Sequence, residues 1–348
     1  MSMIPHSRPT VGDLEAAAAA AVIHSGQLAQ GRQVEAFEAE TAERLGRRHA
    51  VAVSSGTAAL MLTLRALDVK GGRVLLPSYV CSALLHAVHH AGATAVLADV
   101  DRVDGNLHAE PAATDPGMQA VVIPHLFGQP ASIDSSSWGG AAVVEDLAMA
   151  LGCDGVGTAG VASICSFYAT KMITSGGEGG MVVGDDDSLI DEIRSLREYD
   201  GHDPQVLRWN AKLTDVSAAI GRVQLRRLDE FVATRRGHAH RYHQLLQDTQ
   251  LTLPPVSERA NGYRFVVQLP DHCRLEDALI HMRDAGVICH RPIDRPLHRW
   301  LRIADAQFPA STLLWETSMS VPIYPSMTAQ QQDIICAALR KLVGGGAS

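Results

Sequence analysis

Three polar features lie next to apolar, strand-like runs and could together bind and activate a small molecule. Lys171 follows the run "SICSFYAT" and precedes a glycine-rich stretch, so it lies where the chain must turn. Asp146 ends the run "AAVVED", and the polar residues 54–57 separate a short apolar run from a helical pattern. A lysine amine can react with a carbonyl group, a carboxylate can pair with a cation, and a helix N-terminus can bind a phosphate.

Each feature also has a simpler interpretation. Lys171 could be a solvated charge on a loop, Asp146 could cap the next helix, and Ser or Thr is a common helix N-cap. The combination favours chemistry, because a lysine, an acid and a phosphate site at strand ends are the three anchors of pyridoxal 5'-phosphate. In such a site the lysine forms the Schiff base, and the acid pairs with the ring nitrogen so that the ring acts as an electron sink.

The elements that must position these residues are predicted to form an α/β fold. Several nearly continuous Val/Ile/Leu runs are typical of strands buried on both faces of a largely parallel sheet. A helical pattern over 82–93 joins the first two runs and predicts a βαβ unit. Ligands bind beyond the carboxyl ends of the strands in open sheets of this kind. The expected strands are residues 73–79, 94–101, 120–127, 141–148, 163–168 and 179–185.

A long helical pattern follows the strand-rich part of the chain. It covers residues 213–247 and begins at Thr214, a candidate N-cap. A helix of this length often bridges two domains. We therefore predict a large cofactor-binding domain at 1–235, with its N-terminal segment, and a small C-terminal α+β domain at 236–348.

The composition excludes several classes of protein. The chain has 348 residues and a net charge of −8, and no Lys/Arg stripe suggests a nucleic-acid partner. No apolar stretch approaches the ~18 residues of a membrane span, and the N-terminus has no signal-like apolar region. The six cysteines are scattered without a CxxC pair, which favours reduced thiols. We expect a cytoplasmic protein with no membrane partner.

Two other patterns resemble functional motifs, but we predict that neither forms a binding site. "GVGTAG" (155–160) matches GxGxxG, but a strand and not a helix follows it, so we interpret it as a turn. His86, His89 and His90 have helical spacing but no clustered acid or cysteine, so no metal site is expected.

Ordered blocks along nearly the whole chain resemble the DegT/StrS-type sugar aminotransferases, which are fold-type I enzymes that use pyridoxal 5'-phosphate. The blocks include "SGQLAQGRQVEAFEAETAERLGRRHAVAVSSGTAAL", "VVEDLAMALG", "SFYATKMITSGGEGGMVV", "WNAKLTDVSAAIGRVQLRRLD" and "SVPIYPSMT". The resemblance implies that fold: a large domain with a mostly parallel sheet flanked by helices, and a small C-terminal α+β domain.

The resemblance also implies roles for individual residues. Lys171 resembles the Schiff-base lysine, and Asp146 resembles the acid that pairs with the ring nitrogen; both are catalytic candidates. Gly56, Thr57 and Ser166 resemble the phosphate-binding residues. Asn210 resembles an asparagine that reaches the phosphate from a neighbouring subunit, which implies a homodimer with shared active sites.

The implied activity is transfer of an amino group from glutamate or glutamine to a keto-sugar, nucleotide-linked in the usual case, by a ping-pong mechanism through a Lys171 aldimine. Three alternatives stay open: a cyclitol or other small ketone as acceptor, a different reaction on the same cofactor, and a non-catalytic sensor that binds it. Relatives that eliminate water lack the lysine, which argues against that version of the second alternative.

Some pocket positions depart from the family's pattern. Met149 replaces a usual glutamine or histidine, and Cys81 replaces an aromatic residue that stacks on the ring. Lys212 and Ser217 replace a usual arginine and glutamine. We therefore expect weaker contacts to the cofactor ring, unless another side chain such as Tyr79 or His125 compensates.

Overall fold

The structure, a computed structural model, describes residues 3–107 and 117–344. Its centre is a seven-stranded sheet in the order β1-β7-β6-β5-β4-β2-β3. All neighbouring strands are parallel except β7, which is antiparallel to β1 and β6. The strands are β1 (His49–Val53), β2 (Arg73–Pro77), β3 (Thr94–Ala98), β4 (Met118–Pro124), β5 (Ala142–Asp146), β6 (Ala162–Ser166) and β7 (Gly180–Gly184).

The predicted, largely parallel sheet is confirmed. Each expected run overlaps one strand, although β4 begins two residues and β6 one residue before its run. Most residues of these strands are buried, except in the edge strand β3. Each strand is shorter than its run, because the last residues of each run leave the sheet. β4 and β5 pair with Pro124 opposite Asp146, so both strands end at the same edge.

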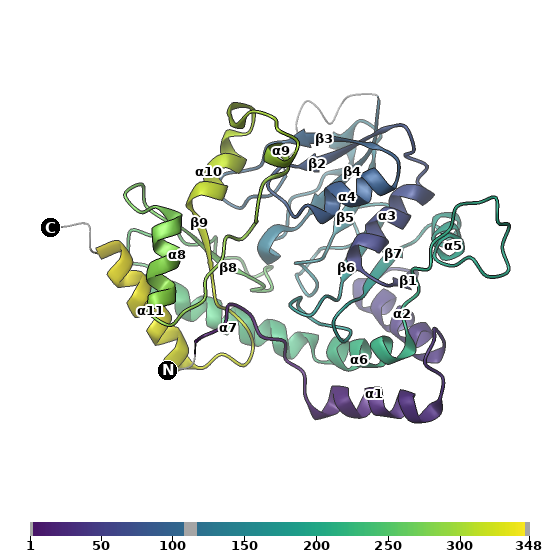
Figure 1. Cartoon of the computed structure of the whole chain (residues 1–348), viewed down its shortest axis with the longest axis horizontal. Coiled ribbons are helices and arrows are strands. Elements are labelled where there is room, and N and C mark those ends of the chain that lie inside the picture. Colours follow the sequence, from purple (N-terminus) through teal and green to yellow (C-terminus); the bar gives the residue numbers. More distant parts are fainter. Residues whose placement is uncertain (1–2, 108–116, 345–348) are drawn as a thin grey trace.

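Helices cover both faces of the sheet (Figure 1). On one face, α3 (Gly56–Ala66), α4 (Ala83–His90) and α5 (Asp187–Leu196) contribute to one apolar core. On the other, α2 (Arg32–Leu45) and α6 (Asp215–Arg226) contribute to a second. α1 (Asp13–Ser25) lies against α6. Short 3₁₀ helices are η2 (Leu126–Gly128), η3 (Ser135–Trp138) and η4 (Asp305–Gln307).

A second, two-stranded sheet lies in the C-terminal part of the chain. β8 (Phe265–Gln268) and β9 (Ser318–Val321) are antiparallel, and α8 (Leu275–Asp284) and α11 (Ala329–Gly344) share a third apolar core with them. Ile4 joins this part through a bridge to Val287. By contrast, α9 (Leu297–Trp300) and α10 (Pro309–Thr317) pack on the core of the large sheet. The division into domains at 235/236 stays a prediction.

The long helical pattern forms two helices and not one. α6 ends at Arg226, and α7 (Leu228–Leu246) begins after Arg227, whose ψ of 0° breaks the helix. Thr214 is the N-cap of α6, and its hydroxyl accepts the N–H of Ser217 at 3.2 Å. Within residues 3–107 and 117–344, no helix combines the length and apolarity needed to cross a membrane.

Candidate active site

A cavity of about 480 Å³ lies at the edge where β4, β5 and β6 end. The structure brings five of the predicted site residues to its wall: Gly56, Thr57, Asp146, Ser166 and Lys171. The C-terminal part of the chain closes the other side with Tyr263, Arg264 and the segment 292–295. Residues far apart in the sequence therefore surround one space.

The start of α3 forms a cradle in this wall. Ser55 is the N-cap, and its hydroxyl accepts the N–H of Ala58 at 3.1 Å, so the capping interpretation is correct for this serine. The first N–H groups of a helix have no partner within the helix. Those of Gly56 and Thr57 have no hydrogen-bond acceptor among residues 3–107 and 117–344, so they remain for a ligand. A Cβ atom on Gly56 would lie 2.8 Å from Cβ of Ser166. The contact therefore requires glycine and brings the Ser166 hydroxyl beside the helix N-terminus, where an anion binds well.

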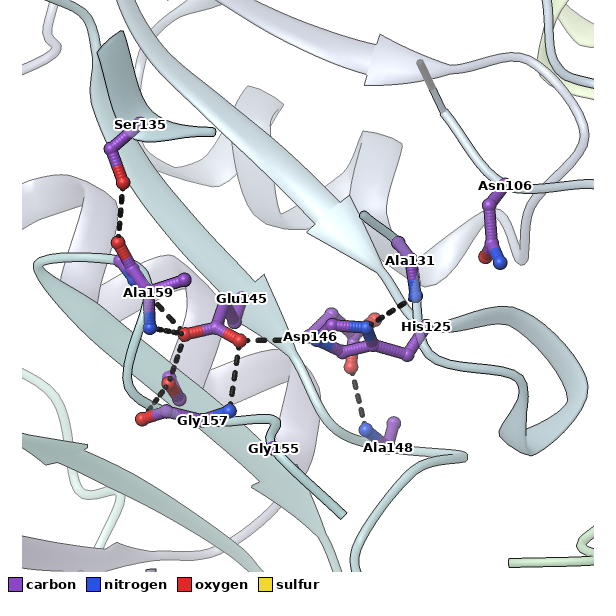
Figure 2. Close-up of polar contacts among 12 residues, drawn as sticks. Asn106, His125, Ala131, Ser135, Glu145, Asp146, Ala148, Gly155, Gly157 and Ala159 are labelled. Carbon is purple, nitrogen blue, oxygen red and sulfur yellow. Dashed lines mark hydrogen bonds and ion pairs between the residues drawn. The ribbon is translucent and has the colours of Figure 1, made fainter. Parts of the chain in front are cut away.

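Asp146 ends β5 and is buried. One carboxylate oxygen accepts the N–H of Ala148 at 2.8 Å (Figure 2), so the residue does cap the following turn. Within the described part of the chain, the other oxygen has no hydrogen-bond partner. Burial raises the pKa of the carboxyl group, although the Ala148 hydrogen bond and the charge of Lys171 oppose the change. A cationic partner would stabilise the charged form of a buried acid of this kind.

Lys171 is half-buried in the turn after β6, where its backbone N–H donates to the carbonyl of Tyr168 at 2.9 Å. Its Nζ lies 5.7 Å from the centre of the Tyr263 ring, and no carboxylate of the described residues forms an ion pair with it. Burial of Tyr263 opposes ionisation, but the charges of Lys171, Arg264 and Arg235 outweigh it and lower the pKa of the phenol. Lys171 therefore lines the cavity without an ion-pair partner among the described residues.

A model of the DegT/DnrJ/EryC1/StrS aminotransferase family matches residues 9–340. The chain belongs to this family. The aminotransferase TlmJ from Streptoalloteichus hindustanus is similar over its whole length, with 29% identity, a TM-score of 0.90, and coverage of 99% of this chain and 100% of that one. An aminotransferase from Psychrobacter cryohalolentis has 26% identity and a TM-score of 0.86, with 97% and 98% covered.

The same fold also occurs in a dehydratase. The GDP-4-keto-6-deoxy-D-mannose-3-dehydratase of E. coli is 20% identical with a TM-score of 0.88, and the match covers 97% of this chain and 100% of that one. At this identity the likeness shows the fold alone.

DegT-family aminotransferases use pyridoxal 5'-phosphate, so the predicted enzyme class, cofactor and fold-type I architecture are confirmed. The residues of the cavity fit this cofactor. The cradle at Gly56 suits its phosphate, the unpartnered oxygen of Asp146 suits its ring nitrogen, and the amine of Lys171 suits its aldehyde.

The positions that depart from the family's pattern also lie at the cavity. Met149 lines it, and its Sδ accepts the N–H of Phe127 at 3.4 Å. Cys81 lines it and is exposed. Of the two side chains that could compensate, Tyr79 is fully buried outside the cavity wall, where its hydroxyl donates to the carbonyl of Leu314 at 3.3 Å. His125 lines the cavity.

Asn210 does not reach this cavity. It is exposed in the segment between α5 and α6, which extends away from the body of the molecule (Figure 1). Nearby Lys212 lies 3.7 Å from carboxylate oxygens of Glu198 and Asp200. The proposed role of Asn210 therefore needs a second copy of the chain.

The "GVGTAG" segment is the turn that the sequence predicted, and it has a structural ligand. Its backbone N–H groups bind the carboxylate of Glu145, a residue for which the sequence predicted no role. Tyr263 and Arg264 were missed as well. For Glu145, the signal in the sequence was its position in a mostly apolar strand, because a buried carboxylate needs several hydrogen-bond donors.

Proposed function

We propose that this aminotransferase moves an amino group from glutamate or glutamine to a nucleotide-linked keto-sugar in two half-reactions that share Lys171. The observation that carries the proposal is the convergence of a reactive amine, an acid with a free oxygen and an anion cradle on one cavity of about 480 Å³. The three groups come from the ends of different strands, so the fold itself sets their spacing.

Each of these residues would have its own role in binding the cofactor or in transferring a proton. The N–H groups at the start of α3 and the Ser166 hydroxyl bind the phosphate, and Asp146 holds the ring nitrogen in its protonated form. Bound in this way, the cofactor supplies an electron sink for the carbon that loses a proton. Lys171 would hold the cofactor covalently; once released, its Nζ takes the proton from the α-carbon of the amino donor.

Two guanidinium groups at the cavity support an anionic acceptor, although the carboxylates of Glu178 and Asp294 line the cavity too. Arg264 and Arg295 both line it, and the guanidinium of Arg295 lies 4.7 Å from the ring centre of Trp300. Guanidinium groups bind phosphate and carboxylate through paired hydrogen bonds. This charge favours a nucleotide-linked sugar over a cyclitol or other uncharged ketone. Because the fold also carries a dehydratase, it is Lys171 and not the fold that favours amino transfer over other chemistry.

The homodimer is part of this proposal. The segment that carries Asn210 exposes Tyr199, Val206 and Leu207, a set of apolar side chains that a partner subunit could cover. A shared active site follows if Asn210 binds the phosphate in the partner's cavity. A cytoplasmic location is likewise proposed, and the six free cysteines agree with it.

Borohydride reduction tests the central assignment. Reduction of the purified holoenzyme should fix the pyridoxyl mass on the peptide that contains Lys171, and Lys171→Ala should abolish turnover. In a separate, unreduced sample, glutamate or glutamine alone should convert the bound cofactor to its amino form, and steady-state kinetics with an acceptor should be ping-pong. Labelling of another lysine would refute the site, whereas labelling without conversion by any amino donor would support the sensor alternative.

A further inference from the structure

A buried carboxylate lies beneath the cofactor site, and the guanidinium of Arg47 is 3.9 Å from its Oε1. Glu145 precedes Asp146 on β5, so its side chain points to the opposite face of the sheet, and it is 0% exposed. Its oxygens accept the N–H groups of Gly157, Ala159 and Gly160 at 2.8, 2.7 and 3.0 Å (Figure 2). Burial opposes its charge, but the hydrogen bonds from His125, Gly160 and Gly157 outweigh it and lower its pKa to about 2.

Glu145 also fixes the imidazole of His125, which lines the cofactor cavity. Nδ1 of His125 accepts the N–H of Ala131 at 2.9 Å, so that nitrogen carries no proton. The proton is therefore on Nε2, which donates to Oε2 of Glu145 at 3.1 Å. Both nitrogens have partners outside the cavity, and the ring has no N–H left for any other acceptor.

This arrangement leaves the carboxylate of Asp146 without a hydrogen bond from the imidazole. The backbone N–H of His125 donates to the carbonyl of Asp146 at 3.2 Å, and the imidazole lies close enough to act on the carboxyl group electrostatically. Figure 2 shows the two side chains next to each other at the ends of β4 and β5. Yet no hydrogen bond joins the imidazole to the carboxylate in the described part of the chain. An imidazole released from Glu145 could turn and donate to the free oxygen of Asp146.

We propose that Glu145 is a positioning residue: it holds the His125 N–H away from Asp146 and so keeps the free carboxylate oxygen for the ring nitrogen of the cofactor. The inference rests on the proposed role of Asp146. It predicts a specific defect, because loss of Glu145 should weaken recognition of the ring nitrogen more than recognition of the phosphate or the aldehyde.

The test compares two ligands that differ at that atom. Pyridoxal 5'-phosphate and its 1-deaza analogue, which has carbon in place of the ring nitrogen, are titrated into the Lys171→Ala protein, where no covalent bond forms. The ratio of their dissociation constants isolates the contact with Asp146. A hydrogen bond to a charged group predicts tighter binding of the natural cofactor by about 10- to 150-fold.

Glu145→Gln in this background should reduce the ratio by about fivefold or more, because the freed imidazole competes for Asp146. Adding His125→Phe should restore it, since phenylalanine keeps a ring but cannot donate. Ser163→Ala is the matched control: it removes a hydroxyl 3.4 Å from Oε1 of Glu145 without touching His125, and should leave the ratio unchanged. A ratio that Glu145→Gln leaves unchanged, or that His125→Phe fails to restore, overturns the inference.

Two further outcomes separate the inference from the function on which it rests. A ratio near one already in the Lys171→Ala protein would refute the role of Asp146 and this inference with it. If Glu145→Gln does not fold, ¹⁵N-histidine NMR of the unsubstituted holoenzyme decides, with His125→Phe used to assign the signal. Protonation of His125 at Nε2 alone supports the arrangement, and a proton on Nδ1 overturns it.

Discussion

Nζ of Lys171 lies over the ring of Tyr263, 5.7 Å from its centre, although the two residues belong to parts of the chain with separate sheets. A cation near an aromatic face is stabilised by about 0.5–2 kcal/mol. The ring therefore helps to hold the amine in the cavity when the amine is not bound to the cofactor.

Replacing this ring should slow the donor half-reaction. Tyr263→Leu removes the aromatic face and should reduce the single-turnover rate with glutamate or glutamine by about 2- to 30-fold. Tyr263→Phe keeps the face and is the control. Equal losses in both variants would assign the effect to the hydroxyl and contradict the role of the ring. Melting temperatures of both proteins should be measured, because Tyr263 is also part of the second core.

The glycine at the phosphate cradle should tolerate no side chain. Gly56→Ala places a Cβ atom 2.8 Å from Cβ of Ser166, and overpacking of this kind costs about 1–3 kcal/mol. We expect cofactor affinity to fall by about 5- to 150-fold. Gly237→Ala is the control, since this glycine in α7 has no neighbour within 4 Å and alanine there should stabilise the helix by about 0.5–1 kcal/mol. Unchanged cofactor affinity in Gly56→Ala would place the phosphate elsewhere.

Asn210 should act in the partner's cavity. Neither Lys171→Ala nor Asn210→Ala homodimers should be fully active, but a mixed dimer has one site with both groups intact. Co-expression with two different affinity tags and purification of the mixed dimer should recover up to about half of the activity per dimer. Mixed dimers without recovered activity would mean that Asn210 serves its own subunit's site, and full activity of the Asn210→Ala homodimer would mean that it serves none.

Met149→Gln should tighten binding of the cofactor if Met149 leaves a ring contact unused. A neutral hydrogen bond contributes about 0.5–1.5 kcal/mol, so the Lys171→Ala protein should gain about 2- to 13-fold in affinity. Met149→Leu, which fills similar space without a polar atom, is the comparison. Equal or weaker binding by the glutamine variant would show that the Met149 contact with the Phe127 N–H matters more.

Acid should destabilise the protein through Glu145. Its pKa is about 2 in the folded chain against an ordinary value of 4.5, so the folded state binds fewer protons between these values. The stability from this carboxylate is complete above pH 4.5 and is lost as the pH falls toward 2, by roughly 3 kcal/mol in total. Urea unfolding should therefore show a smaller loss of free energy from about pH 5 to about pH 3 in Glu145→Gln than in the unsubstituted protein. A parallel loss in both would contradict the low pKa.

Residues at the ends of successive strands could be predicted from the sequence, because one topological rule brings them to the same edge. Asp146 and Lys171 were found in this way. Tyr263 could not be, since it reaches the cavity from a segment whose path depends on tertiary packing. The break at Arg227 was equally hidden: neither glycine nor proline marks it. The role of Glu145 could not be predicted either, because its donors lie 12 to 15 residues further along the chain, in a turn whose path depends on tertiary packing.

The helix α7 limits how far the two sheets can move relative to each other. Its first half packs in the core of the large sheet through Leu228 and Phe231, and its second half packs in the core of the small sheet through Tyr242 and Leu246. A continuous helix that packs in both cores is rigid, because it lacks the loop residues that absorb large changes of backbone angle in a hinge. We therefore expect substrate entry and product release to involve shorter segments of the cavity wall, such as 292–295.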